Sequence, residues 1–122
     1  MMKSRETSTR LNCREVEEKS RKVEELQRII REFDQMAADL ELQIKIEEER
    51  TRVRDQSHFS YSTFAKAAAQ RRDNLRQSTK GLRESLAAAV RERDGKMEQI
   101  SRAAGREDGN RRDTPFAITA TR

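Results

Sequence analysis

The sequence predicts an all-α protein: an antiparallel two-helix coiled-coil hairpin, residues 1–104, with a disordered C-terminal tail. Three observations predict this fold, namely a seven-residue apolar repeat in the first half, one short reversal, and a second helical pattern after it. The 122 residues are 40% charged and 4% aromatic, with a mean hydropathy of -1.10, which leaves too little apolar surface for a globular core. Two paired helices need only a narrow apolar contact line, here called the seam. Disorder is the alternative for so polar a chain, but periodic apolar positions favour helices.

The first helix is predicted over residues 11–54. Apolar residues recur there at two positions of a heptad, the spacing that lets one helix lie along another in a left-handed supercoil. One position is filled by Val16, Val23, Ile30, Ala37 and Ile44, and the other by Leu26, Phe33 and Leu40. Asn12 and Lys19 take the second position near the N-terminus, so the seam is expected to weaken there. Ile29 and Met36 flank the seam and thicken its middle.

Residues 55–61 are rich in turn formers and predict the reversal. The second helix is expected over residues 62–104, with Ser62 or Thr63 as its N-cap. Its seam is predicted to contain two successive four-residue steps, a stutter that locally unwinds a supercoil. The predicted seam residues are Ala65, Ala68, Leu75, Thr79, Leu82 and Leu86, followed by Val90, Met97, Ile100 and Ala104.

Two glycines make the second helix the weaker one, because Gly81 and Gly95 each cost about 1 kcal/mol relative to Ala. The helical period ends at Ala104. The remaining residues, 105–122, include two further glycines and the single proline, and they predict a disordered basic tail.

The two arms carry opposite charge. Residues 11–54 hold 10 basic and 12 acidic side chains, whereas residues 62–104 hold 10 basic and 5 acidic ones. Opposite net charges favour pairing the arms with each other over pairing two copies of one arm. An intramolecular antiparallel hairpin is therefore expected in preference to a parallel homodimer.

The sequence lacks the residue sets that are typical of several classes of function. Cys13 and His58 are each the only residue of their type, so neither an intrachain disulfide nor a Cys/His zinc site is expected. No glycine-rich phosphate loop or Ser/His/Asp set occurs, and the glutamates 47–49 are expected on a solvated helix face. We therefore expect no catalytic residues, no cofactor and no metal. No apolar run spans a bilayer or forms a signal peptide, which predicts a cytoplasmic location.

Basic and acidic residues alternate along most of the chain, although its net charge is +5. Nucleic-acid binding prefers a basic stripe with few acids nearby. A local basic face is predicted from Arg71, Arg72, Arg76, Lys80 and Arg83. Nucleic acid is therefore not the expected partner, and a basic nucleic-acid-associated protein is the least favoured alternative.

Three of the five aromatic residues, Phe59, Tyr61 and Phe64, lie within six positions at the turn. They are expected either to plug the open end of the hairpin or, if they face outward, to form a binding tip.

The chain resembles the flagellar export protein FliJ family in its alphaproteobacterial form, over roughly residues 2–90. The segments 3–7, 10–11 and 36–41 contribute to the likeness. Its specific part is the turn Asp55-Gln56-Ser57-His58-Phe59-Ser60-Tyr61 together with the run Phe64-Ala65-Lys66-Ala67-Ala68-Ala69-Gln70-Arg71-Arg72-Asp73-Asn74-Leu75. Compared with the family pattern, the chain is divergent or truncated at its C-terminus, where glycines interrupt the second helix.

The resemblance implies a non-enzymatic stalk and general chaperone component of the flagellar type III protein export apparatus. It implies contacts with the export ATPase ring, the export gate membrane protein and substrate chaperones, at a cytoplasmic site or peripherally at the inner membrane. Arg5, Arg10 and Arg14 match the end of the stalk that faces the ATPase ring. The other predicted partner-binding residues are Phe59, Tyr61, Phe64, Arg71 and Arg72. A generic coiled-coil adaptor that dimerises is the alternative function.

Overall fold

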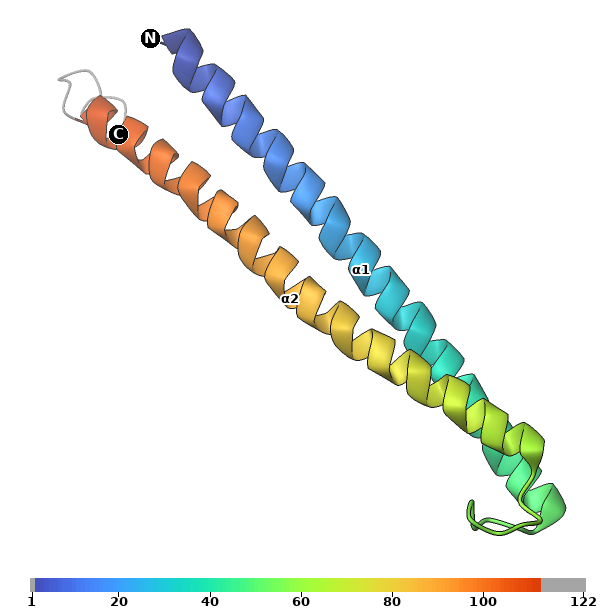
Figure 1. Ribbon diagram of the computed structural model, residues 1–122. Helices are drawn as coiled ribbons and strands as arrows, with labels where there is room; N and C mark the ends of the chain where they lie inside the picture. The colour runs from blue at the N-terminus through green and yellow to red at the C-terminus, as the bar shows by residue number, and fades with distance from the viewer. Residues whose placement is uncertain (1, 113–122) are drawn as a thin grey trace. The chain divides into compact units, whose positions relative to one another are not determined.

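The computed structural model describes residues 2–112, with side chains described for residues 5–106. It contains two α-helices, α1 from Met2 to Thr51 and α2 from Thr63 to Arg112, and no strand in the described range (Figure 1). The predicted all-α helical hairpin is confirmed. The chain divides into two compact units: the turn unit, Glu24–Ala87, and the terminal unit, Met1–Val23 with Ala88–Arg122.

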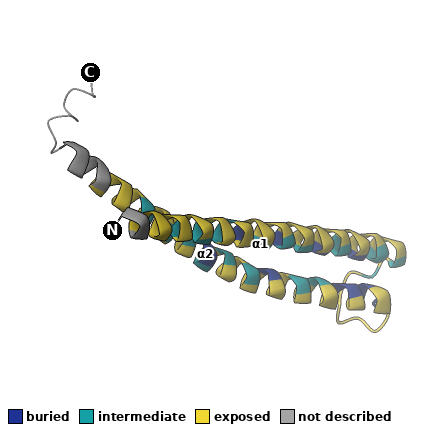
Figure 2. Ribbon diagram, turned by 90° about the horizontal axis from the view of Figure 1, so that it is seen from above, coloured by how far each residue is buried: buried dark blue, intermediate teal, exposed yellow. Residues whose placement is uncertain are grey.

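In the turn unit, α1 and α2 run antiparallel. Going along α1, Asp34 pairs with Arg83 and Glu41 pairs with Arg72, so the partners on α2 move in the reverse direction. The buried residues lie on the sides by which the helices face each other, while exposed residues cover the outer sides (Figure 2). The buried set is Ile30, Ala37 and Ile44 on α1, with Tyr61 before α2 and Ala65, Ala68, Ala69 and Thr79 on α2.

The terminal unit also contains antiparallel segments of α1 and α2. Among its residues with described side chains, the buried ones are Val23, at 2% exposure, and Ala89, at 5%. Val16, Val90 and Ile100 are half-buried. Ion pairs connect its two helical segments, from Lys19 Nζ to Glu92 Oε2 at 3.2 Å and from Lys96 Nζ to Glu15 Oε2 at 2.8 Å.

The seam of α1 lies where the heptad predicts, but the seam of α2 needs a correction. The predicted stutter is wrong, because the covered residues continue in alternating steps of three and four through Leu86, Ala89, Arg93, Lys96 and Ile100. The predicted seam residues Met97 and Ala104 are exposed. A rigid helix keeps its heptad spacing through this stretch, so polar side chains occupy seam positions where the apolar residues are out of register.

The ends of both helices differ from the predicted ones. α1 begins at Met2 rather than near residue 11, since Met, Lys, Arg and Glu favour helix even without a seam. α2 continues eight residues past 104, through Gly95 and Gly105, so residues 105–112 of the predicted tail are helical. Residues 113–122 of that tail lie outside the described residues.

Candidate interaction surfaces

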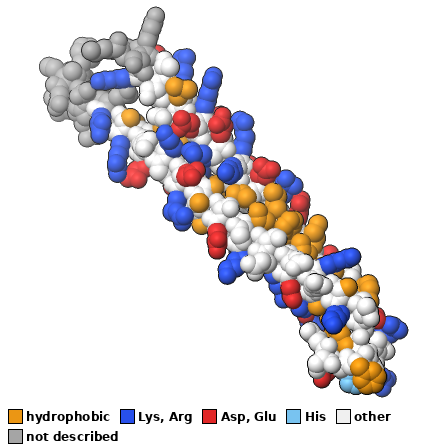
Figure 3. Space-filling view, viewed as in Figure 1, with side chains coloured by type: hydrophobic (Ala, Val, Ile, Leu, Met, Phe, Trp, Pro, Cys, Tyr) orange, Lys and Arg blue, Asp and Glu red, His pale blue; other side chains and the backbone are white. Residues whose placement is uncertain are grey.

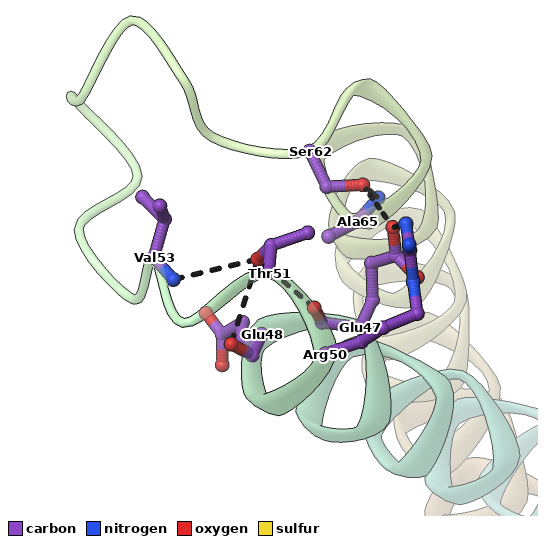
Figure 4. Close-up of polar contacts among 7 residues, drawn as sticks. All are labelled: Glu47, Glu48, Arg50, Thr51, Val53, Ser62 and Ala65. Carbon is purple, nitrogen blue, oxygen red and sulfur yellow. Dashed lines mark hydrogen bonds and ion pairs between the residues drawn. The ribbon is translucent and has the colours of Figure 1, made fainter.

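α1 ends at Thr51, about two turns after its last buried residue, Ile44, and its end is fixed by local hydrogen bonds. The Thr51 hydroxyl donates to the Glu47 carbonyl at 3.0 Å and accepts from the Val53 N–H at 3.4 Å (Figure 4). Arg52 has a φ of 59°, which turns the chain out of the helix in the left-handed conformation. α1 therefore ends at Thr51, three residues before the predicted end.

The start of α2 is tied to the end of α1. Ser62 is the N-cap, as predicted, since its Oγ accepts the Ala65 N–H at 3.2 Å. The same hydroxyl donates to Glu47 Oε1 at 2.9 Å, and Figure 4 shows these two side chains pointing toward each other, one from α1 and one from the residue before α2. Arg50 binds both oxygens of this carboxylate, since its Nη2 donates to Oε1 at 2.6 Å and its Nε donates to Oε2 at 3.0 Å. The Arg50 hydrogen bond, aided by that of Ser62, lowers the pKa of Glu47.

The loop between the helices is a series of tight turns. The His58 N–H donates to the Asp55 carbonyl and the Tyr61 N–H to the His58 carbonyl, both at 3.0 Å. Asp55 Oδ1 accepts the Ser57 hydroxyl and N–H, which lower the pKa of Asp55. His58 Nδ1 accepts the Ser60 N–H at 3.0 Å. These bonds hold the loop in one shape without apolar burial of its tip.

The three turn aromatics divide between the two expected roles. Tyr61 is 9% exposed and belongs to the core cluster of Ile44 and Ala65, with its hydroxyl donating to Glu48 at 3.0 Å. Its burial, and then this hydrogen bond, raise the pKa of Tyr61. Phe59 and Phe64 are instead 94% and 57% exposed. Tyr61 closes the hairpin, whereas the two phenylalanines face solvent.

Phe59 is supported by its neighbour. The His58 and Phe59 rings stack with centroids 4.7 Å apart and planes inclined by 22°. Figure 3 shows the single histidine, in pale blue, against a hydrophobic side chain at the turn (Figure 3). An exposed, pre-positioned aromatic ring is a favoured anchor of protein interfaces, because little conformational freedom is lost when it binds.

One side of the seam in the turn unit, here called the ion-paired flank, is closed by charged pairs. Arg72 lies at a seam position with a side chain 14% exposed, and it donates to Glu41 and Asp73. Arg76 lies 3.7 Å from the same Glu41 oxygen. The Arg72 hydrogen bond lowers the pKa of Glu41 and raises that of Arg72. Of the predicted partner-binding residues, Arg72 is thus occupied within the hairpin.

The other side of the seam, here called the open flank, has a groove of about 490 Å³. Its lining comes from both helices and consists of Met36, Asp39, Leu40, Gln43, Arg71, Asn74 and Leu75. Met36 is 51% exposed, while Leu40 and Leu75 are half-buried. Arg71, also predicted to bind a partner, has its side chain exposed beside this groove and forms no ion pair with a described residue. Arg71 and Arg72 therefore have different roles although they are adjacent.

The N-terminal arginines lie on α1, in the terminal unit. Arg5, Arg10 and Arg14 are exposed and form no ion pair with any side chain described between 5 and 106. Their spacing of five and four residues distributes them around part of the helix surface. They are available to an acidic surface.

The predicted basic face is largely neutralised. Arg72 and Arg76 pair with Glu41, and Arg83 pairs with Asp34 at 3.0 Å. Phosphate binding needs basic groups free of such acidic partners. This arrangement gives no support to nucleic-acid binding.

The described part of the chain has neither a cluster of metal ligands nor a membrane-spanning helix. No group of three or more His, Cys, Asp or Glu residues there could hold a metal ion. Cys13 is exposed. Neither described helix has a stretch long and apolar enough to cross a membrane.

The sequence did not predict the groove on the open flank. The heptad places Met36 beside the seam and the clustered arginines place Arg71 on a basic face, but nothing in the one-dimensional pattern places them against the same groove. The signal that could have found it is the contrast between heptad flanks: Asp34 and Glu41 follow seam residues by four, whereas Met36 and Gln43 precede them by one. Beside the seam, one flank of α1 thus has Asp34 and Glu41, and the other has Met36 and Gln43.

An antiparallel pair of helices is a fold that many unrelated functions share, so the fold alone does not identify a function. What distinguishes this hairpin is an outward-facing aromatic pair at the turn, a groove on one flank and unpaired arginines near the start of α1. The chain matches no protein-family model, and no curated protein or solved structure matches it at a significant level.

Proposed function

We propose that the chain is a non-enzymatic stalk and general chaperone component of the flagellar type III protein export apparatus. In this role it contacts the export ATPase ring, the export gate membrane protein and substrate chaperones. The observation that carries the proposal is the antiparallel hairpin with Phe59 94% exposed at a hydrogen-bonded turn. A long charged hairpin with few apolar contacts suits a protein that acts through several weak interfaces.

A non-enzymatic role fits the state of the clustered glutamates. The pKa of Glu47 is lowered by Arg50 and Ser62, whereas a general acid at neutral pH needs a raised one. Glu48 accepts a hydrogen bond from Tyr61, and both Glu47 and Glu48 are partly buried by contacts at the helix ends instead of lying on the solvated face expected for them. Their geometry supports a structural role in joining the helix ends.

The division of contacts follows from side-chain chemistry. Arg5, Arg10 and Arg14 offer charge without apolar anchoring, which suits transient contacts with an acidic surface of the ATPase ring. Phe59 and Phe64 offer apolar anchors, which suit a docking contact with the gate or a chaperone. Tyr61 packs in the core of the hairpin, so it is not proposed as an interface residue.

The test uses ATPase stimulation by the full chain, measured with the cognate export ATPase. Replacing Arg5, Arg10 and Arg14 with Glu is expected to reduce stimulation while helix content by circular dichroism stays that of wild type, because exposed charges contribute little to folding. Phe59→Ala is the matched variant: it should leave both stimulation and helix content unchanged and weaken binding to the gate. Stimulation by the triple variant equal to wild type would refute the ring contact.

A generic coiled-coil adaptor that dimerises is the second candidate, and the open flank favours it. Met36, in the lining of the groove on that flank, is 51% exposed. A stable dimer that neither binds nor stimulates an export ATPase would make the adaptor the better assignment.

A further inference from the structure

The two flanks of the turn unit differ in how their charges are used. On the ion-paired flank, Glu41 and Asp34 already have arginine partners on α2. No ion pair between the helices is found on the open flank of the described turn unit. Its groove of about 490 Å³ instead has Met36, Leu40 and Leu75 in its lining, a partly covered apolar surface. Such a surface is the kind that further helices cover in a bundle.

The groove also holds one free charge of each sign. Asp39, contributed by α1, is exposed and accepts only the neutral Gln35 amide, at 3.0 Å. Arg71, contributed by α2, is exposed and has no hydrogen bond or ion pair with a described residue. The groove therefore carries two opposite charges that are not paired with each other in the hairpin.

We propose that this groove is the contact surface for a second copy of the chain, so that two hairpins associate as a four-helix bundle. A two-fold axis along the groove places α1 of one copy against α2 of the other. Asp39 and Arg71 lie at the same level along the turn unit, because the nearby Glu41 and Arg72 pair directly on the other flank. One symmetry operation thus brings each Asp39 opposite the Arg71 of the partner copy, and two ion pairs form around the apolar centre.

A second copy fits better than an unrelated helix because the groove supplies both members of each charge pair. A partner of other origin would have to provide an acid and a base at the matching spacing. The proposed dimer depends only on the groove and not on which protein binds at the turn. A result that refutes the dimer therefore does not refute the export role, and the reverse is also true.

Sedimentation velocity of the full chain over a range of concentrations tests the proposal. Wild type is expected to shift from monomer to dimer as concentration rises. Asp39→Arg and Arg71→Asp should each weaken the dimer about tenfold or more, since each places like charges together twice in a symmetric interface. The double variant Asp39→Arg with Arg71→Asp should regain the wild-type dissociation constant. Glu49→Arg is the matched control, because Glu49 is exposed on α1 outside the groove, and it should change nothing.

Met36→Glu provides an independent check of the apolar centre. Met36 is 51% exposed, so the variant should keep wild-type helix content by circular dichroism and yet abolish the dimer. Wild type that stays monomeric up to about 100 μM, a concentration at which an interface of standard size is saturated, would overturn the proposal. A charge-swapped double variant that dimerises no better than the single variants would overturn it as well.

Discussion

The turn unit and the terminal unit use the same heptad spacing but fill it differently. In the turn unit one position of the α1 seam is filled by Ile30, Ala37 and Ile44, all under 9% exposed, and the other by the half-buried Leu26, Phe33 and Leu40. In the terminal unit half of the seam positions are polar, including Lys19 and Lys96 with side chains about 30% exposed. The turn unit thus buries apolar surface, whereas the terminal unit joins its helices with partly solvated ion pairs.

This difference indicates where the stability lies. Burial of apolar surface contributes roughly 25 cal/mol per Å², while solvated ion pairs contribute between 0 and about 1 kcal/mol each. The seam arginine of the turn unit, Arg72, is more covered than either seam lysine and has two acidic partners. We therefore expect the terminal unit to open at lower free energy than the turn unit.

The largest effect is expected from removing apolar volume in the turn unit. Ile44 is 3% exposed and packs in the cluster of Tyr61, Ala65 and Ala68. Ile44→Ala should lower the free energy of unfolding by about 2–4 kcal/mol, through lost burial and the cavity left behind. Urea unfolding followed by circular dichroism measures it. Ile46→Ala is the matched control, since Ile46 is 57% exposed, and it should change the value by less than about 0.5 kcal/mol. Equal effects of the two changes would show that the seam is misassigned.

A second effect, in the opposite direction, is expected from making the seam of the terminal unit apolar. Lys19→Leu combined with Lys96→Leu replaces two partly solvated ion pairs by apolar contact and should stabilise by about 1–2 kcal/mol. Slower hydrogen exchange of amides in residues 12–23 and 89–100 would report it. Lys22→Leu, at an exposed position, should slow none of them. Unchanged exchange in the double variant would contradict the polar-seam explanation for the weakness of this unit.

The glycines of α2 offer a smaller gain in each unit. A methyl group added at Gly81 or Gly95 meets no atom within 4 Å. Gly81→Ala and Gly95→Ala should therefore each stabilise by up to about 1 kcal/mol, because Ala loses less backbone freedom in a helix. Hydrogen exchange should place the gain of Gly81→Ala in the turn unit and that of Gly95→Ala in the terminal unit. A loss of stability in either variant would contradict the open space at that glycine.

The sequence predicted the fold class and the seam of α1 because heptad spacing reports helix pairing directly. It misplaced the seam of α2 between Leu86 and Ile100, since it followed Val90 and Met97 by hydrophobicity. In the structure the seam positions are one residue earlier, where Ala89 is buried and Lys96 is half-buried. Because a continuous helix keeps its heptad register, polar residues of α2 fall at seam positions. The local hydrophobicity pattern does not show which residues these are.

The candidate interaction surfaces were predicted only in part. Aromatic clustering identified the turn, but whether a ring faces in or out depends on the loop hydrogen bonds of His58 and Asp55, which composition does not reveal. Arg71 and Arg72 are adjacent in sequence and differ by about 100° around the helix, so one pairs with Glu41 and the other lies by the groove. The export role stays a prediction.

Acidification should lower the stability of both units, by less than the substitutions described above. Hydrogen bonds from Arg72 and Lys96 lower the pKa of Glu41 and Glu15 below the ordinary value of 4.5. A lowered folded-state pKa contributes stability that is present above the unfolded value and lost as pH falls through the folded one. The melting temperature should therefore be constant near neutral pH and fall below about pH 4.5, and Glu41→Gln should flatten that fall. A melting temperature independent of pH down to about pH 2 would refute the contribution of these pairs.

The smallest effect is expected at the end of α1. Arg52 has a φ of 59°, a conformation that costs a residue with a Cβ about 1 kcal/mol and costs glycine nothing. Glycine also raises the entropy of the unfolded chain, so Arg52→Gly should stabilise by only a few tenths of a kcal/mol relative to Arg52→Ala. Arg54→Gly, two residues on and without a positive φ, should instead destabilise slightly relative to Arg54→Ala. Thermal unfolding of the four variants, measured side by side, gives the comparison. If glycine were no better than alanine at position 52, the left-handed end of α1 would not be a strained point of the turn unit.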